Sequence, residues 1–246
     1  MGEIRTRDVT YRFEGAEMKG VAAWDESTSG PRPVVLVAHE WWGCTEYVQR
    51  RAKLLAQIGY LGFAVDLYGA GRTAANPEEA GKLMEGLLAD RIELRGRFHA
   101  ALEAARSLEQ ADPQRAAAIG YCRGGGIVLH MARTGMDLAA VASFHGALSL
   151  AIAEEGEDAE VTARMAVYHG EADEFVTAED VSAFLQEVES ARADCLFVLM
   201  PGSTHGFTNP EASIRGEKYG LPLRYDERAD RASWDHMQLV LENAFR

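Results

Sequence analysis

The 246-residue sequence has only three cysteines, no long apolar run, and fewer basic than acidic residues. Three cysteines, Cys44, Cys122 and Cys195, are too few and too scattered for a disulfide framework or a zinc site. No apolar stretch approaches a membrane span, and the first residues lack the apolar core of a signal peptide. These absences predict a cytoplasmic protein with free thiols, no metal and no membrane partner.

Acidic residues outnumber basic ones by 38 to 25, which gives a formal net charge of -13. This charge disfavours binding to nucleic acid. The composition, 47% hydrophobic and 26% charged, is typical of globular proteins. The length fits one α/β domain with a large core. We therefore expect a single domain over 1–246, a monomer or small homo-oligomer, with a small molecule as its partner.

Apolar runs alternate with helical patterns after an expected antiparallel hairpin near residues 5–23. The expected strands are 34–39, 61–66, 115–120, 139–144, 164–169 and 195–200. The expected helices lie near 45–58, 77–108, 123–133, 178–191 and 230–245. Such alternation predicts an α/β fold with a mostly parallel sheet that helices cover on both faces.

Three further segments carry expectations of their own. Residues 69–90, rich in small side chains, are expected to contribute to a cap over a pocket. The acidic stretch 154–158 is expected to be a solvated loop. Cys195 begins an apolar run and is expected to be a structural thiol in a buried strand.

The most informative pattern is Gly120-Tyr121-Cys122-Arg123-Gly124, which joins an apolar run to a helical stretch. This is the strand, turn and helix context of a G-x-S-x-G nucleophile elbow, with cysteine in place of serine. Glycines on both sides remove the Cβ atoms that would clash in so tight a turn. A helix that begins at this point also favours the thiolate of Cys122.

A base and an orienting acid follow the nucleophile in the expected order. The segment 169–173, His-Gly-Glu-Ala-Asp, follows one apolar run, and 201–207, which contains His205, follows the next. Open α/β sheets place their sites at the carboxyl ends of strands, so Cys122, Asp173 and His205 can converge. Nearby carboxylates compete for the role of the acid, but the position after the turn glycine favours Asp173. An isolated buried cysteine or loop histidine is more often inert, and the order of all three favours a catalytic triad.

The chain resembles the dienelactone hydrolase family of the α/β-hydrolase superfamily, also described as carboxymethylenebutenolidase-like. The resemblance spans nearly the whole chain and rests on five segments of the sequence, which are 39–43 (His-Glu-Trp-Trp-Gly), 66–69 (Asp-Leu-Tyr-Gly), 120–125, 169–173 and 205–207. It implies an α/β-hydrolase fold and a Cys-His-Asp triad. It also implies that Glu40 lies beside Cys122, holds the resting thiol largely neutral and takes its proton when substrate arrives.

Independent reasoning supports Glu40, which follows an apolar strand and is expected to be partly desolvated, with a raised pKa suited to proton transfer. The alternative is a capping or solvent-facing carboxylate. The backbone N–H groups of Trp41 and Arg123 are the expected oxyanion donors.

The residues expected to contact substrate are less sharply defined. The resemblance implies an arginine four residues after the catalytic histidine, where it would help to hold the glutamate and a substrate carboxylate. This chain has Asn209 at that position. Arg72 or the Arg123 side chain could supply a cation instead, although ordinary surface roles are common for arginine. His145 is expected either to line the pocket or to be a hydrogen-bonded structural histidine. Trp42 and Phe207 complete the expected substrate contacts.

The predicted function is hydrolysis of a small-molecule lactone or ester, with a dienelactone as the reference substrate and no cofactor. Attack by Cys122 forms an acyl-thioester, which water activated by His205 then hydrolyses. Two alternatives stay open. One is a hydrolase of another ester with the same triad, as Asn209 suggests, and the other is a non-hydrolytic thiol sensor of oxidants that uses Cys122 and Cys44.

Overall fold

The structure is a computed structural model that describes residues 2–152 and 160–246. The acidic stretch expected at 154–158 lies outside these residues. Contacts between Cα atoms divide the chain into two compact units, Met1–Ala118 and Ile119–Arg246, which are described in turn. The single-domain organisation over 1–246 stays a prediction.

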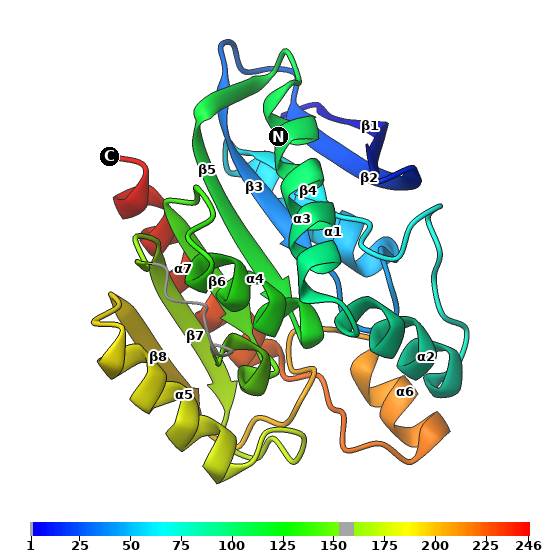
Figure 1. Cartoon of the computed structure of the whole chain (residues 1–246), viewed down its shortest axis with the longest axis vertical. Coiled ribbons are helices and arrows are strands. Elements are labelled where there is room, and N and C mark those ends of the chain that lie inside the picture. The colour runs from blue at the N-terminus through cyan, green and yellow to red at the C-terminus, as the bar shows by residue number, and fades with distance from the viewer. Residues whose placement is uncertain (1, 153–159) are drawn as a thin grey trace. The chain divides into compact units, whose positions relative to one another are not determined.

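The first unit begins with the expected antiparallel hairpin (Figure 1). Strand β1 (Ile4–Phe13) pairs with β2 (Ala16–Asp25), with Phe13 opposite Ala16. The two turn residues, Glu14 and Gly15, have φ angles of 46° and 83°. A type I′ turn needs a positive φ at both central positions, and glycine supplies the second at no steric cost.

Two buried strands continue this sheet. Strand β3 (Arg32–Ala38) pairs in parallel with β4 (Leu61–Ala64), which pairs on its other side with β2 in antiparallel fashion. The order within the first unit is therefore β1-β2-β4-β3. Helix α1 (Glu46–Gln57) packs on this sheet. The side chains of 34–38 are fully buried, which explains why this strand reads as a continuous apolar run.

The single helix expected near 77–108 is wrong, because two helices occupy this region. They are α2 (Pro77–Leu88) and α3 (Arg91–Arg106). The break lies at Asp90, whose carboxylate accepts a hydrogen bond from the backbone N–H of Glu93 at 2.9 Å and starts a new helix. An aspartate is a favoured N-cap residue, so Asp90 was a sequence signal for the start of a second helix at Arg91 that the sequence reasoning missed. The role of 69–90 as a cap stays a prediction.

In the second unit, three parallel strands lie side by side in the order β6-β7-β8. Strand β5 (Ala111–Tyr121) crosses from the first unit into the second. The three strands are β6 (Ala140–Phe144), β7 (Arg164–Gly170) and β8 (Cys195–Met200). Their parallel pairing brings the carboxyl ends of the strands to one edge, where the loops after β6, β7 and β8 begin.

The buried strand expected to begin at Cys195 is wrong in one respect. Strand β8 ends the sheet order, and its Leu196 and Leu199 are 43% and 49% exposed. Cys195 itself is partly exposed. An apolar run does not distinguish an edge strand from a central one, so the exposure of β8 was not predictable from this run.

The second unit has four α-helices and one short 3-10 helix among its described residues. They are α4 (Arg123–Arg133), α5 (Ala178–Ser190), α6 (Ala212–Tyr219) and α7 (Glu227–Ala244), with a short 3-10 helix (Leu148–Ala151). Helix α7 packs on β6 and β7, and α4 packs on β6. The 3-10 helix and α6 were not expected, because stretches of four and eight residues carry too little periodicity.

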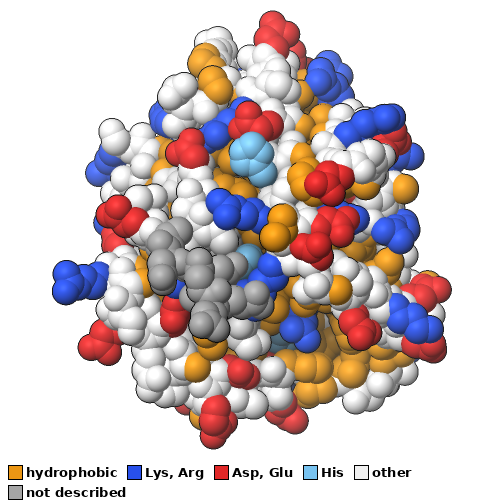
Figure 2. Space-filling model, viewed as in Figure 1, with side chains coloured by type: hydrophobic (Ala, Val, Ile, Leu, Met, Phe, Trp, Pro, Cys, Tyr) orange, Lys and Arg blue, Asp and Glu red, His pale blue; other side chains and the backbone are white. Residues whose placement is uncertain are grey.

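Together these elements confirm an α/β-hydrolase type of fold with a mostly parallel sheet and an N-terminal antiparallel hairpin. The face shown in Figure 2 carries acidic and basic side chains interspersed with apolar ones. Within the described residues, no helix is both long enough and apolar enough to cross a membrane.

Candidate active site

Cys122 lies in a sharp turn between the end of β5 and the start of α4, as the sequence predicts. Its φ and ψ are 55° and -122°, a region that non-glycine residues rarely occupy. Such a conformation costs about 1–3 kcal/mol. The turn leaves no room for side chains, because a Cβ on Gly120 would lie 2.1 Å from the carbonyl oxygen of Gly124. Glycine at position 120 is therefore a steric requirement of the turn.

The main chain of the turn is held by the loop after β6. The backbone N–H of Cys122 donates to the carbonyl of Phe144 at 3.0 Å and to Nδ1 of His145 at 3.1 Å. Because Nδ1 of His145 accepts, the ring proton lies on Nε2, which donates to Thr208 Oγ1 at 2.8 Å. His145 is fully buried, and its φ of 40° is itself unusual. The structure thus gives His145 the hydrogen bonds of the structural alternative.

The expected acid and base are brought together at the carboxyl ends of β7 and β8. Nδ1 of His205 lies 2.8 Å from Oδ2 of Asp173, and both side chains are at least nine-tenths buried. The other oxygen of Asp173 accepts from the backbone N–H of Phe175 at 2.9 Å. His205 also hydrogen-bonds the side chain of Cys122. The three residues therefore form a continuous chain of hydrogen bonds within the second unit.

The electrostatics of this chain favour a proton on His205. Burial lowers the pKa of His205, since it disfavours the charged ring. The charge of the Cys122 sulfur and the hydrogen bonds to Asp173 and Cys122 outweigh burial and raise the pKa to about 10. When the Cys122 sulfur is charged, a protonated His205 beside it completes the ion pair that activates cysteine nucleophiles.

Glu40, Trp41 and Trp42 lie in the loop that follows β3 in the first unit. Glu40 is 6% exposed, as expected for a desolvated carboxylate, and its carbonyl is 2.6 Å from Nδ1 of His39. The carbonyl of Trp41 accepts from the Tyr68 hydroxyl at 2.8 Å. The rings of Trp41 and the buried Trp42 meet edge to face, 5.1 Å apart. The loop is thus held in shape by main-chain and ring contacts.

Asp66 is a structural residue that the sequence reasoning did not single out. It is fully buried just after β4. Its two carboxylate oxygens accept from four backbone N–H groups at 2.8–3.0 Å, those of Lys19, Tyr68, Gly69 and Gly71. An aspartate followed at short range by glycines is a turn signal that could have revealed this role.

The remaining expected substrate residues have diverse surroundings. Arg72 is exposed, and its guanidinium donates to the carbonyls of Gly69, at 3.2 Å, and Tyr68. Arg123 is the partly exposed first residue of α4.

Phe207 and Asn209 are both buried in the loop after β8. The Phe207 ring meets the His145 ring edge to face at 5.2 Å. Oδ1 of Asn209 accepts from the backbone N–H of Glu211 at 3.0 Å, at the start of α6. At this position the chain thus places an amide that orders the next helix.

The other two cysteines have environments unlike that of Cys122. Burial, with a smaller effect of Asp66, raises the pKa of Cys44 to about 12. Burial and Asp194 raise the pKa of Cys195 to about 11. Both thiols are therefore protonated near neutral pH and poor nucleophiles. Within the part of the chain that the structure describes, no cluster of three or more His, Cys, Asp or Glu side chains could hold a metal ion.

Comparisons with known proteins cover most or all of the chain. The model of the dienelactone hydrolase family matches residues 18–245. A crystal structure of a dienelactone hydrolase-like promiscuous phosphotriesterase from metagenomic libraries is 31% identical, covers all of both chains and has a TM-score of 0.93. A protein of Aquifex aeolicus named "Putative carboxymethylenebutenolidase" is 29% identical over 207 residues, which is 82% of this chain and 86% of that protein.

Proposed function

This chain belongs to the dienelactone hydrolase family, and we propose that it hydrolyses a small-molecule carboxylic ester or lactone through Cys122, His205 and Asp173. The hydrogen-bonded chain from the Cys122 sulfur through His205 to Asp173 carries this proposal. Its members follow the ends of β5, β7 and β8, in the order nucleophile, acid and base that α/β hydrolases use.

The first half of the reaction forms an acyl-enzyme. The Cys122 sulfur attacks the carbonyl carbon, and the new oxyanion accepts from the backbone N–H groups of Trp41 and Arg123. When the carbon–oxygen bond of the ester breaks, His205 gives its proton to the leaving alkoxide. The product is a thioester on Cys122 and an alcohol, which for a lactone stays attached to the acyl group.

The pKa of His205 supplies the base for the second half. While the sulfur carries charge it raises the pKa of His205, so the ring holds its proton. Acylation removes that charge, and burial then favours the neutral ring. Neutral His205 takes a proton from water as the water attacks the thioester. The tetrahedral intermediate collapses to the carboxylic acid and expels the sulfur, which restores the starting pair.

Glu40 has a separate proposed role before the attack. The resting Cys122 is a largely neutral thiol, and Glu40 takes its proton when substrate arrives, which forms the charged sulfur that attacks the carbonyl carbon. The burial of Glu40 after β3 supports this role. For Glu40→Gln we expect a lower kcat/KM and an altered pH profile of activity. If Glu40 were purely structural, the same substitution would lower the free energy of unfolding and leave the pH profile unchanged. We also propose that substrate contacts Arg72, Trp42, Phe207 and Asn209. A role in degradation of aromatic compounds is a further proposal, and so is a cytoplasmic location.

The proposal is tested by mass spectrometry of the intact protein after brief mixing with a dienelactone or a simple activated ester. We expect a transient acyl adduct on Cys122 that decays as acid is released. Cys122→Ala should lose the adduct and at least about a thousandfold in kcat/KM. Cys195→Ala is the matched control and should retain both. Full activity of Cys122→Ala would show that another group is the nucleophile.

A second activity is suggested by the relative described as a promiscuous phosphotriesterase, which is 31% identical over the full length of both chains. A phosphotriester would be attacked by the same sulfur and would lose an alkoxide. Release of nitrophenol from a nitrophenyl phosphotriester, and its loss in Cys122→Ala, would establish this activity. A rate equal to that of Cys122→Ala would exclude it.

The alternative of a thiol sensor has weaker support. Cys44 is 7% exposed, and its raised pKa makes it a poor partner for an oxidised Cys122. A sensor also has no need for His205 and Asp173 in acyl-transfer geometry. Reversible oxidation of Cys122 in a protein that turns over no ester or lactone would favour the sensor.

A further inference from the structure

A cavity of about 230 Å³ lies within the first unit, where the loop after β4 faces α2 and α3. Its charged lining residues are all cations, namely Arg72 from the loop, Lys82 from α2 and Arg97 from α3. In a chain with a net charge of -13, three elements thus direct positive charge into one hollow. None of the lining residues belongs to the triad.

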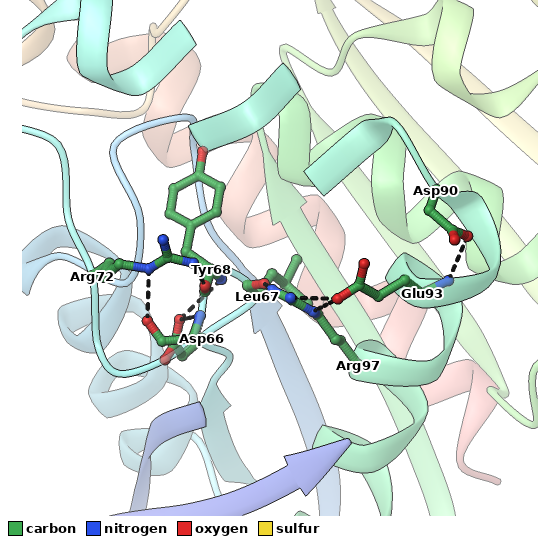
Figure 3. Close-up of polar contacts among 8 residues, drawn as sticks. Asp66, Leu67, Tyr68, Arg72, Asp90, Glu93 and Arg97 are labelled. Atoms are coloured by element: carbon green, nitrogen blue, oxygen red, sulfur yellow. Dashed lines mark hydrogen bonds and ion pairs between the residues drawn. The ribbon is translucent and has the colours of Figure 1, made fainter. Parts of the chain in front are cut away.

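Arg72 is held in place without losing its charge. Its Nε atom donates to the carbonyl of Gly69, and its Nη2 atom donates to the carbonyl of Tyr68, which Figure 3 labels beside Arg72. Among the described residues no carboxylate forms an ion pair with it. Carbonyl partners fix the guanidinium plane while the full positive charge stays available, which prepares the group for an incoming anion.

Arg97 and Lys82 are paired, but differently. Nη1 of Arg97 donates to the Leu67 carbonyl at 2.6 Å, and Nη2 lies 2.5 Å from Glu93, as Figure 3 also shows. The Arg97 side chain is only 14% exposed and therefore preorganised. Lys82 forms an exposed ion pair with Glu78 at 2.7 Å. Exposed pairs of this kind contribute little to stability, so Lys82 can exchange Glu78 for a ligand at little cost.

The rest of the lining is apolar, with Leu83 and Leu87 on α2 beside the charged groups. A cavity of this size has room for a small organic molecule but not for a polymer. Arginine forks match planar or tetrahedral oxyanions, and leucine side chains favour a hydrocarbon body.

We propose that this cavity binds a small organic oxyanion, with its carboxylate or phosphate head on Arg72, Lys82 and Arg97 and its apolar part on Leu83 and Leu87. The cavity contains no triad residue, and of its three cations only Arg72 is also proposed to contact the ester substrate, so Lys82 and Arg97 distinguish this site from the substrate pocket. Binding and hydrolysis can therefore fail independently of each other.

The test is calorimetric titration of the full-length protein with benzoate and with phenyl phosphate, and with neutral benzamide as the control ligand. We expect one or both anions to bind, which identifies the head group, and benzamide not to bind. Binding should weaken as salt is raised to about 0.5 M, since screening reduces the attraction. Absence of binding by both anions up to about 20 mM would overturn the proposal.

Variants locate the site. Lys82→Glu and Arg72→Gln should each raise the Kd at least about tenfold. Lys53→Glu, an equal charge change on the exposed face of α1, should raise it less than about twofold. Cys122→Ala should bind as the parent does. Equal Kd values for the parent, Lys82→Glu and Arg72→Gln would place the anion elsewhere and overturn the proposal.

Discussion

The turn after β4 and the turn after β5 both follow buried strands, yet the polar side chain in each turn has a different kind of partner. In the first turn, both carboxylate oxygens of Asp66 accept hydrogen bonds from backbone N–H groups, four in all. In the second turn, the Cys122 side chain forms a hydrogen bond with the side chain of His205, and the backbone of Cys122 is strained by its positive φ. A buried polar group that satisfies the main chain stabilises the fold. One that is held in strain against another titratable group is prepared for chemistry.

The sharpest test of this contrast is Asp66→Ala. It would leave four backbone N–H groups without their acceptor, and we expect a loss of about 4 kcal/mol in the free energy of unfolding. Urea denaturation monitored by circular dichroism measures the loss. Asp66→Asn keeps one acceptor oxygen and should lose less. A loss below about 1 kcal/mol for Asp66→Ala would remove the distinction between the two turns.

Alkylation separates the cysteines by their surroundings. At pH 7.5, iodoacetamide should modify Cys122 at least about a hundredfold faster than Cys44, whose pKa near 12 leaves almost no thiolate. Cys195, with a pKa near 11, is the partly exposed control and should also react slowly. Peptide mass spectrometry over time gives the three rates. Comparable rates would show that His205 does not activate Cys122.

The charge of the Cys122 sulfur is expected to control the proton on His205. Cys122→Ser replaces an ionisable thiol with a neutral hydroxyl, so the pKa of His205 should fall from about 10 by at least about one unit. The sign follows from the sulfur charge, which raises the pKa and is lost in the variant. Titration of the ring by NMR measures both values, and Cys195→Ser should leave the pKa unchanged. An unchanged pKa in Cys122→Ser would contradict the ion pair.

The smallest expected effect is a gain in stability. Cys122→Gly relieves the positive φ at this position and should raise the free energy of unfolding by about 1 kcal/mol while it abolishes turnover. Cys122→Ala keeps the Cβ and the strain, and it serves as the matched control. If Cys122→Gly were less stable than Cys122→Ala, the turn would not be strained.

Motif spacing predicted that Cys122, Asp173 and His205 lie together, because the strand ends, the glycines and the order of the three residues are local features. Sequence reasoning failed where a local signal was weak, or where a feature depends on contacts between residues far apart in the sequence. The N-cap Asp90 was hidden within a long helical pattern. The exposure of β8 depends on which strands pair beside it, and an apolar run carries no record of that. The two hydrogen bonds of His145 reach the distant Cys122 and Thr208, so only the folded chain reveals them.

The separation of the triad along the chain also has a consequence for biosynthesis. His205 is made 83 residues after Cys122. At about 5–20 residues per second, a ribosome needs about 4–17 s to supply it. During that interval the nascent chain carries its nucleophile without its base. The proposed pair of Cys122 and His205 therefore cannot form until this whole stretch of chain has been made.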